Sequence, residues 1–282
     1  MTGMPHMKSL NLAIAATLSL AAGAAHAEDA NWTGFHVGVV GGYAVRSESS
    51  GESIGFDTNL DGKFDNTVNN AAGANAFSTG FCGGAFNTNA APGGCRGDDK
   101  SDIEIGVRAG YDYQFAGNWV VGGVVEYTQL QLQDAVTAFS ITPAAYTFTR
   151  KLRDTIAIRA RAGYALGDNL LYATGGYAQG TVRHSFRTTN TVNGFPLSGG
   201  GDAKGYQVGF GFERKITPNW TLGAEFLRTS LKDDDFGTRA INNGTTVATN
   251  PFLLVNTAGT GFRRTDDTIG YNSYRVTVGY RF

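Results

Sequence analysis

Ten charged side chains recur at alternating positions within runs of apolar and small residues. Five are acidic and five are basic: Glu104, Arg108, Asp112, Glu126, Arg159, Arg161, Glu213, Glu225, Arg275 and Arg281. Isolated charges are costly to bury, so charges that share an enclosed face must pair with one another. The pattern therefore predicts a network of ion pairs. A narrow conducting pathway lined by the same charges is the alternative.

Cys82 and Cys95 are the two cysteines of the chain. In an oxidising compartment such a pair is expected to form a disulfide. Free or metal-binding thiols are the alternative, but two cysteines without a nearby histidine make a poor zinc site.

A short acidic segment resembles a calcium-binding loop. It offers oxygen ligands at alternating positions, namely Asp57, Asn59, Asp61, Lys63 (through its backbone carbonyl) and Asp65. Gly62 at the sixth position permits the tight turn that such loops need. The twelfth position is Val68 instead of the bidentate glutamate of an EF-hand. Possible calcium binding is predicted, with a solvated polar turn as the alternative; no cofactor is required.

The N-terminus predicts export. Lys8 precedes an apolar stretch from Leu10 to Ala22, and Ala25-His26-Ala27 has the small-x-small form of a cleavage site. We expect residues 1–27 to be a signal peptide and residues 28–282 to be one domain. The apolar stretch is shorter than the ~20 residues of a membrane-spanning helix. A formal net charge of −1 gives no attraction to nucleic acid.

Eight runs in the mature chain alternate between apolar and polar or small residues, which is the period of a β-strand. The runs are Phe35–Val45, Asp102–Phe115, Trp119–Leu132, Leu152–Tyr164, Leu170–Arg183, Ala203–Lys215, Trp220–Leu231 and Tyr271–Phe282. Each is long enough to cross a bilayer, which takes ~9–11 residues. We therefore expect an all-β, eight-stranded antiparallel up-and-down transmembrane β-barrel. Such a barrel is just wide enough for its own side chains to fill.

The connections between these runs alternate between short and long. The long ones are 46–101, 133–151, 184–202 and 232–270. Short turns at the periplasmic end and long loops outside are typical of outer-membrane barrels, so four long extracellular loops are expected. Ten aromatic residues fall at the short-turn ends and predict a periplasmic girdle: Trp32, Phe35, Tyr113, Phe115, Trp119, Tyr164, Phe212, Trp220, Tyr280 and Phe282.

Several segments also resemble a known family. They are Trp32–Gly38, Leu171–Ala178, Gly209–Glu213 with Thr217–Trp220, and the terminal Tyr280-Arg281-Phe282. Together they resemble the opacity-like outer-membrane β-barrel family, whose alphaproteobacterial members are called porin-family or outer-membrane immunogenic proteins. His36 stands where the family usually has tyrosine, and the first long loop is larger than usual. The resemblance implies an eight-stranded surface barrel and leaves open whether it conducts solutes.

We expect a non-enzymatic integral protein of the Gram-negative outer membrane with a structural or surface-interaction role. A small-solute porin is the alternative, and a barrel hydrolase is less favoured because only His36 and His184 survive processing. Expected partners are outer-membrane lipid and lipopolysaccharide, a possible host or cell-surface ligand, and the assembly machinery. Tyr280 and Phe282 resemble the signal that this machinery recognises, an apolar last strand with a terminal aromatic residue.

Overall fold

The computed structural model describes residues 31–47, 51–97, 100–233 and 236–282. The predicted signal peptide, residues 1–27, therefore lies outside the described residues. Among the described residues, no helix is long and apolar enough to cross a membrane.

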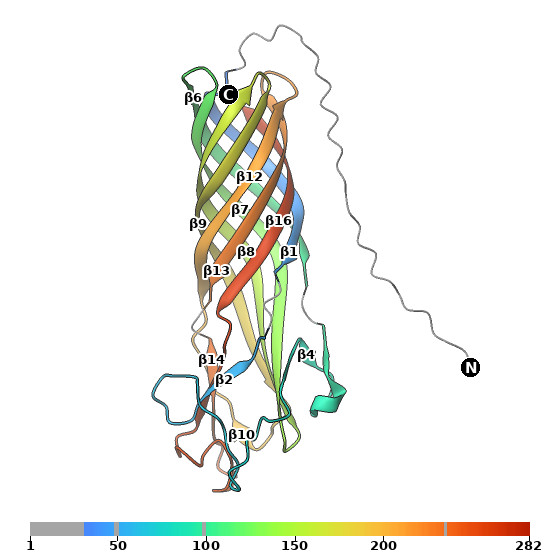
Figure 1. The fold of residues 1–282 in the computed structure, drawn as a ribbon, viewed down its shortest axis with the longest axis vertical. Helices are drawn as coiled ribbons and strands as arrows, with labels where there is room; N and C mark the ends of the chain where they lie inside the picture. The colour runs from blue at the N-terminus through green and yellow to red at the C-terminus, as the bar shows by residue number, and fades with distance from the viewer. Residues whose placement is uncertain (1–30, 48–50, 98–99, 234–235) are drawn as a thin grey trace, which may run out of the picture.

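Eight long antiparallel strands form a closed ring (Figure 1). They are β1 (Gly34–Arg46), β6 (Asp102–Phe115), β7 (Trp119–Ser140), β8 (Ala144–Leu166), β9 (Asn169–Thr188), β12 (Asp202–Lys215), β13 (Trp220–Lys232) and β16 (Thr268–Arg281). Each of these strands pairs with the next one in the ring, and β1 closes the ring by pairing with β16 from His36↔Arg281 to Arg46↔Tyr271. The predicted eight-stranded antiparallel barrel is confirmed.

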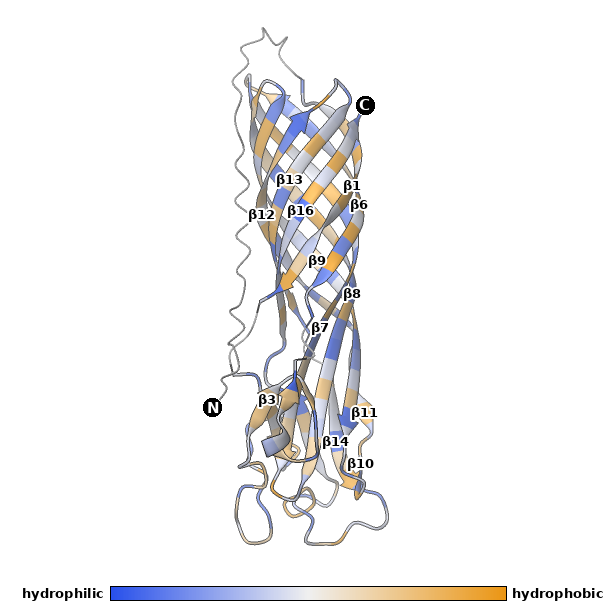
Figure 2. Cartoon of the chain, turned by 90° about the vertical axis from the view of Figure 1, so that its right-hand side faces the viewer, coloured by the Kyte–Doolittle hydropathy of each residue, from blue (hydrophilic) through white to orange (hydrophobic). Residues whose placement is uncertain are grey.

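Apolar and polar residues are interspersed along the barrel strands (Figure 2), and their burial alternates between two faces. Phe35, Val37 and Val39 point outward and are 45–66% exposed, whereas the intervening His36 is buried. A closed sheet has no free edge, and its two faces meet different surroundings. The exposed band is therefore suited to lipid and the buried face forms the interior.

Short turns join the strands at the end of the barrel that holds the C-terminus. In the turn between β6 and β7, Ala116 and Gly117 both have positive φ, 45° and 80°. Glycine adopts this conformation readily, whereas alanine rarely does. This end agrees with the short turns expected from the sequence.

At the opposite end the segments between strands fold into a second structure, which we call the loop unit (residues 51–97, 133–151, 184–201 and 236–267). Its own strands are β2 (Ile54–Asp57), β3 (Phe81–Gly83), β4 (Ala85–Phe86), β5 (Cys95–Arg96), β10 (Asn193–Gly194), β11 (Leu197–Ser198), β14 (Gly237–Asn242) and β15 (Thr260–Arg264). The strands β10, β14, β15 and β2 form a sheet in that order, and β11 also pairs with β14.

The loop unit also contains the outer ends of three barrel strands. β7 and β8 remain paired as far as Ser140↔Ala144, so residues 133–151, predicted as a long loop, are instead a continuous hairpin. That prediction was wrong. The hairpin packs its apolar side chains against the second sheet, and the resulting core contains Phe56, Phe77, Tyr146, Phe148 and Phe262.

Candidate functional site

The interior of the barrel holds all ten charged residues singled out from the sequence, and every one of them is buried. They come from six of the eight strands, at positions where alternation turns the side chain inward. We call this set the lumen network. It is one continuous chain of ion pairs, in which each carboxylate contacts at least one guanidinium.

The centre of the lumen network is built around Glu126. Its carboxylate accepts hydrogen bonds from Arg159, at 3.0 Å, and from Arg275. Arg275 also donates to Glu104 at 2.8 Å through Nε. Glu225 lies 3.5 Å from both Arg159 and Arg275, so this third carboxylate contacts the same pair of cations as Glu126.

Nearer the short turns, Glu213 joins the centre to a second group. It accepts hydrogen bonds from Arg108 at 2.7 Å and from Arg161 at 2.9 Å. Arg161 and Arg281 both donate to Asp112. The attraction between the paired charges offsets much of the free-energy cost of removing them from water. That cost is several kcal/mol for an unpaired ion.

Two apolar layers enclose the lumen network, and the sequence did not predict them. At the short-turn end, Trp32 is fully buried with Val120, Ala165, Leu170 and Tyr172. Trp32 was predicted to belong to the aromatic girdle, and that prediction was wrong. Its indole Nε1 donates a hydrogen bond to the carbonyl of Gly167, and the Arg281 guanidinium lies 4.9 Å from its ring centre.

The other apolar layer lies between the lumen network and the loop unit. It contains Leu130, Leu132, Leu152, Leu231 and Tyr271 among its buried members. Aliphatic and aromatic side chains from most of the strands meet here across the interior. An ion that moved through the barrel would have to leave water at both layers.

A second ion cluster lies beyond this layer, where the strands project past the exposed apolar band. Asp134 contacts three guanidiniums, those of Arg46 at 2.8 Å and of Arg150 and Arg264 at 2.7 Å each. Burial alone would raise the pKa of Asp134, but the three guanidiniums outweigh it and hold the pKa below the ordinary value of 3.8. The stability that this carboxylate contributes is therefore present above about pH 4 and is lost as the pH falls through the lowered pKa.

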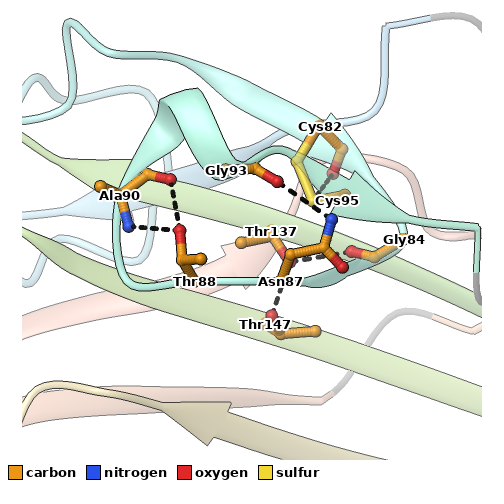
Figure 3. Close-up of a disulfide and its surroundings, with 9 residues drawn as sticks. All are labelled: Cys82, Gly84, Asn87, Thr88, Ala90, Gly93, Cys95, Thr137 and Thr147. Carbon is orange, nitrogen blue, oxygen red and sulfur yellow. Dashed lines mark hydrogen bonds between the residues drawn. A yellow bond between two sulfur atoms is a disulfide. The ribbon is translucent and has the colours of Figure 1, made fainter.

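The disulfide predicted from the sequence is present, since Cys82 in β3 is bonded to Cys95 in β5. Figure 3 shows it beside the β7–β8 hairpin. β3 pairs with β7, and Thr137 of β7 donates a hydrogen bond at 2.8 Å to the carbonyl of Gly84. The disulfide thus closes a segment that is already attached to the hairpin.

The candidate calcium loop forms a tight turn around Asp57. The two carboxylate oxygens of Asp57 accept backbone N–H groups, from Asp61 at 3.1 Å and from Gly62 at 2.9 Å. Asn59 and Asp61 also accept backbone N–H groups within the turn, and Asp65 accepts a side-chain N–H from Asn66. In the described ranges, no three carboxylate, imidazole or thiol groups gather so as to hold a metal ion. Calcium binding by Asp57, Asn59, Asp61, Lys63 and Asp65 stays a prediction.

The two histidines among the described residues lie in different parts of the molecule. His36 faces inward, 3.5 Å from Asp112. His184 belongs to the loop unit, where its Nε2 lies 2.9 Å from Asp233 and its ring stacks on Phe236. Among the described residues, neither imidazole contacts a serine, threonine or cysteine nucleophile.

The tip of the loop unit contains a cavity of about 240 Å³. Its lining includes Asn70, Thr142, Tyr146, Asn190, Asn250 and Phe252, from four segments that are far apart in the sequence. Asn190 donates a hydrogen bond to the Tyr146 hydroxyl at 2.9 Å, which fixes one wall. Among the residues that the structure describes, no charged side chain lines this cavity. It offers amide, hydroxyl and aromatic groups to a small neutral ligand.

The last strand carries the two terminal aromatic residues on its outer face. Phe282 is 75% exposed, and the Tyr280 ring contacts both Phe282 and Trp220 at centroid distances of 5.1 and 5.3 Å. Both residues therefore belong to the aromatic ring at the short-turn end.

The chain matches a family model and two curated proteins. The model of the outer membrane protein β-barrel domain matches residues 132–282, more than half of the chain. The chain is 30% identical, over 131 residues, to the 31 kDa outer-membrane immunogenic proteins of Brucella melitensis and Brucella suis, a match that covers 45% of this chain and 52% of each relative. The chain thus spans about half the length of the curated relatives it matches.

A solved structure is also similar. The outer membrane protein OprG from Pseudomonas aeruginosa is 15% identical, with a TM-score of 0.46 and coverage of 90% of this chain and 98% of that chain.

Proposed function

The chain belongs to the outer membrane protein β-barrel domain family, and from this premise we propose that its barrel anchors a surface unit and conducts no solutes. The protein resides in the outer membrane. One observation carries the proposal: the interior is filled, with the lumen network held between two buried apolar layers. Function then rests with the loop unit, which has a hydrophobic core of its own.

The proposed orientation puts the loop unit outside the cell and the short turns in the periplasm. Long loops of outer-membrane barrels are extracellular, and their turns face the periplasm. In this orientation the tip cavity is the outermost part of the protein. We propose that a ligand of a host or another cell surface binds there. The surrounding partners are outer-membrane lipid and lipopolysaccharide. The half-buried Tyr280 and the exposed Phe282 are the proposed recognition signal for the assembly machinery.

The proposed role is non-enzymatic. A hydrolase needs a base beside a nucleophile, and the His184–Asp233 pair has no such neighbour among the described residues. Hydrolysis assays on lipid A and on peptides, with His184→Ala for comparison, should give no activity that depends on His184. Activity lost in that variant would support the hydrolase alternative instead.

Conductance recording tests the closed interior. Full-length protein reconstituted in a planar bilayer should give no resolved current steps, because the apolar layers exclude hydrated ions. The matched comparison opens both layers. It combines Leu152→Gly/Leu231→Gly, in the layer next to the loop unit, with Trp32→Gly/Leu170→Gly, in the layer at the short-turn end, and should admit ions. Regular current steps from the unaltered protein would refute the proposal and favour the small-solute porin.

A further inference from the structure

Five basic side chains gather on the outer wall of the barrel, on four adjoining strands. They are Lys151 and Arg153 of β8, Arg183 of β9, Lys204 of β12 and Lys232 of β13. We call this set the basic face. Its sequence neighbours Leu152, Val182, Ala203 and Leu231 are buried in the interior. Strand alternation therefore turns the five basic side chains outward.

The strand register sets like charges directly opposite one another. Lys204 of β12 is the partner of Lys232 in β13, and Lys151 of β8 is the partner of Arg183 in β9. Like charges in such positions destabilise a sheet. In addition, a β-bulge in β8 falls between Leu152 and Asp154, so that Arg153 adds a further cation to the same region.

Three carboxylates near the basic face offset part of its charge. Asp267 lies 3.7 Å from Lys232, and Asp202 accepts a hydrogen bond from Gln179. Asp154 follows Arg153 at the bulge. The like-charged pairs Lys151–Arg183 and Lys204–Lys232 nevertheless stand side by side, and an anionic ligand would reduce the repulsion within each pair.

The basic face lies just beyond an exposed ring of tyrosines. Tyr177 and Tyr206 are directly paired on the outer wall and are 48% and 53% exposed. Lys204 is two residues beyond Tyr206 toward the loop unit, ~7 Å along the strand. Tyrosines settle at the level of lipid head groups, so the lysine lies where head-group phosphates are found.

The other side of the barrel differs at the same level. Two residues beyond the exposed Tyr43, Tyr127 and Tyr274, the outward positions are Val45, Gln129 and Asn272. A general preference for basic residues next to lipid would have placed them on these strands too. None of these three positions carries a positive charge.

We propose that the basic face is a binding site for the phosphorylated head group of an outer-leaflet glycolipid. Its phosphate oxygens accept hydrogen bonds from Lys204 and Lys232 and from Lys151, Arg153 and Arg183. Rows of cations suit a ligand with more than one phosphate. The site rests on the orientation given under the proposed function, because only the outer leaflet surrounds this end of the barrel.

The test compares lipid binding by the folded, full-length protein in detergent micelles. The probes are bisphosphorylated lipid A and chemically dephosphorylated lipid A, with affinity measured by native mass spectrometry. Bisphosphorylated lipid A should bind, and the dephosphorylated form should not. Removing two cations in Arg183→Gln/Lys204→Gln should weaken binding about 25-fold, about fivefold for each charge. Arg239→Gln is the matched control, since Arg239 is an exposed basic residue of β14 in the loop unit, away from the barrel wall.

The double variant should fold, because both altered residues are exposed, and heat-modifiable migration on gels checks this. Wild-type affinity in the folded double variant would overturn the proposal. So would equal binding of dephosphorylated lipid A, which would mean that the acyl chains alone are held. Displacement of the lipid by millimolar inorganic phosphate would assign the site to a free anion instead. If the barrel conducts ions but still binds lipid A, the proposed closed interior is refuted and the lipid-binding proposal stands.

Discussion

Individual buried charges in this protein depend on more than one partner. Glu126 is held by both Arg159 and Arg275, and Asp134 is held by three guanidiniums in the outer cluster. Removing an acidic residue with two cationic neighbours takes an anionic partner from both of them at once. The consequences of a substitution are therefore larger here than at an isolated surface ion pair, whose contribution is ~0–1 kcal/mol.

We predict that Glu126→Leu lowers the free energy of unfolding of the barrel by about 3–5 kcal/mol, the usual cost of breaking a buried pair. The measurement is the urea midpoint of refolded protein in micelles, followed by tryptophan fluorescence. Asp168→Asn, in an exposed short turn, is the control and should leave the midpoint unchanged. If Glu126→Leu also unfolds at the wild-type midpoint, water and not the two arginines satisfies this carboxylate.

At this scale the sequence predicted the lumen charges but not the apolar side chains around them. Each charge stands between residues that face outward, so alternation alone turns it inward. Trp32 precedes the first strand, where no alternation exists, and its burial depends on contacts with the distant Gly167 and Arg281. Leu130 and Leu152 were not singled out because an apolar residue at a strand end fits a lipid-facing position equally well.

Among the elements, the β7–β8 hairpin shows most clearly where sequence patterns fail. Residues 135–139 and 144–148 are almost all buried, on both faces of the hairpin. A strand that is covered on both sides loses the period-2 pattern by which it is recognised. The same hairpin supports β3 and the disulfide, so the first long loop acquires structure from a partner that lies more than 50 residues away.

The candidate calcium loop can be tested independently of the disulfide. If calcium binds Asp57, Asn59, Asp61 and Asp65, a chelator should increase proteolytic cutting within residues 57–65, while cutting near residues 82–95 stays the same. Reduction should increase cutting near residues 82–95 and leave cutting within residues 57–65 unchanged. The Cys82–Cys95 bond closes a ring that stabilises the folded state by ~3 kcal/mol in the chain-entropy model. Mass mapping of limited digests measures both. Equal cutting near Asp61 with and without chelator leaves only a polar turn.

The whole molecule is a filled barrel that continues into a folded unit at one end. Alternating loop lengths predicted the barrel and its two unequal ends, because both follow from local sequence. The core of the loop unit joins segments from all four long connections, and no local sequence pattern predicts such long-range contacts.

The orientation of the molecule can be checked on intact cells. Protease added from outside should cut only in the loop unit, at exposed connections such as residues 243–249, and should spare the turns at Gly117-Asn118 and Thr217–Asn219. Permeabilised cells provide the control, since these turns are exposed to a protease that reaches the periplasm. A cut at either turn in intact cells would reverse the orientation.

The tip cavity combines residues from four connections, among them Asn70, Thr142, Asn190 and Asn250. Its shape exists only when these connections are folded together on the hairpin. An antibody that recognises this region must therefore bind a discontinuous epitope. Short synthetic peptides from any one connection cannot reproduce it. Because the cavity walls are already ordered, such an antibody would lose little affinity to the entropy of fixing flexible loops.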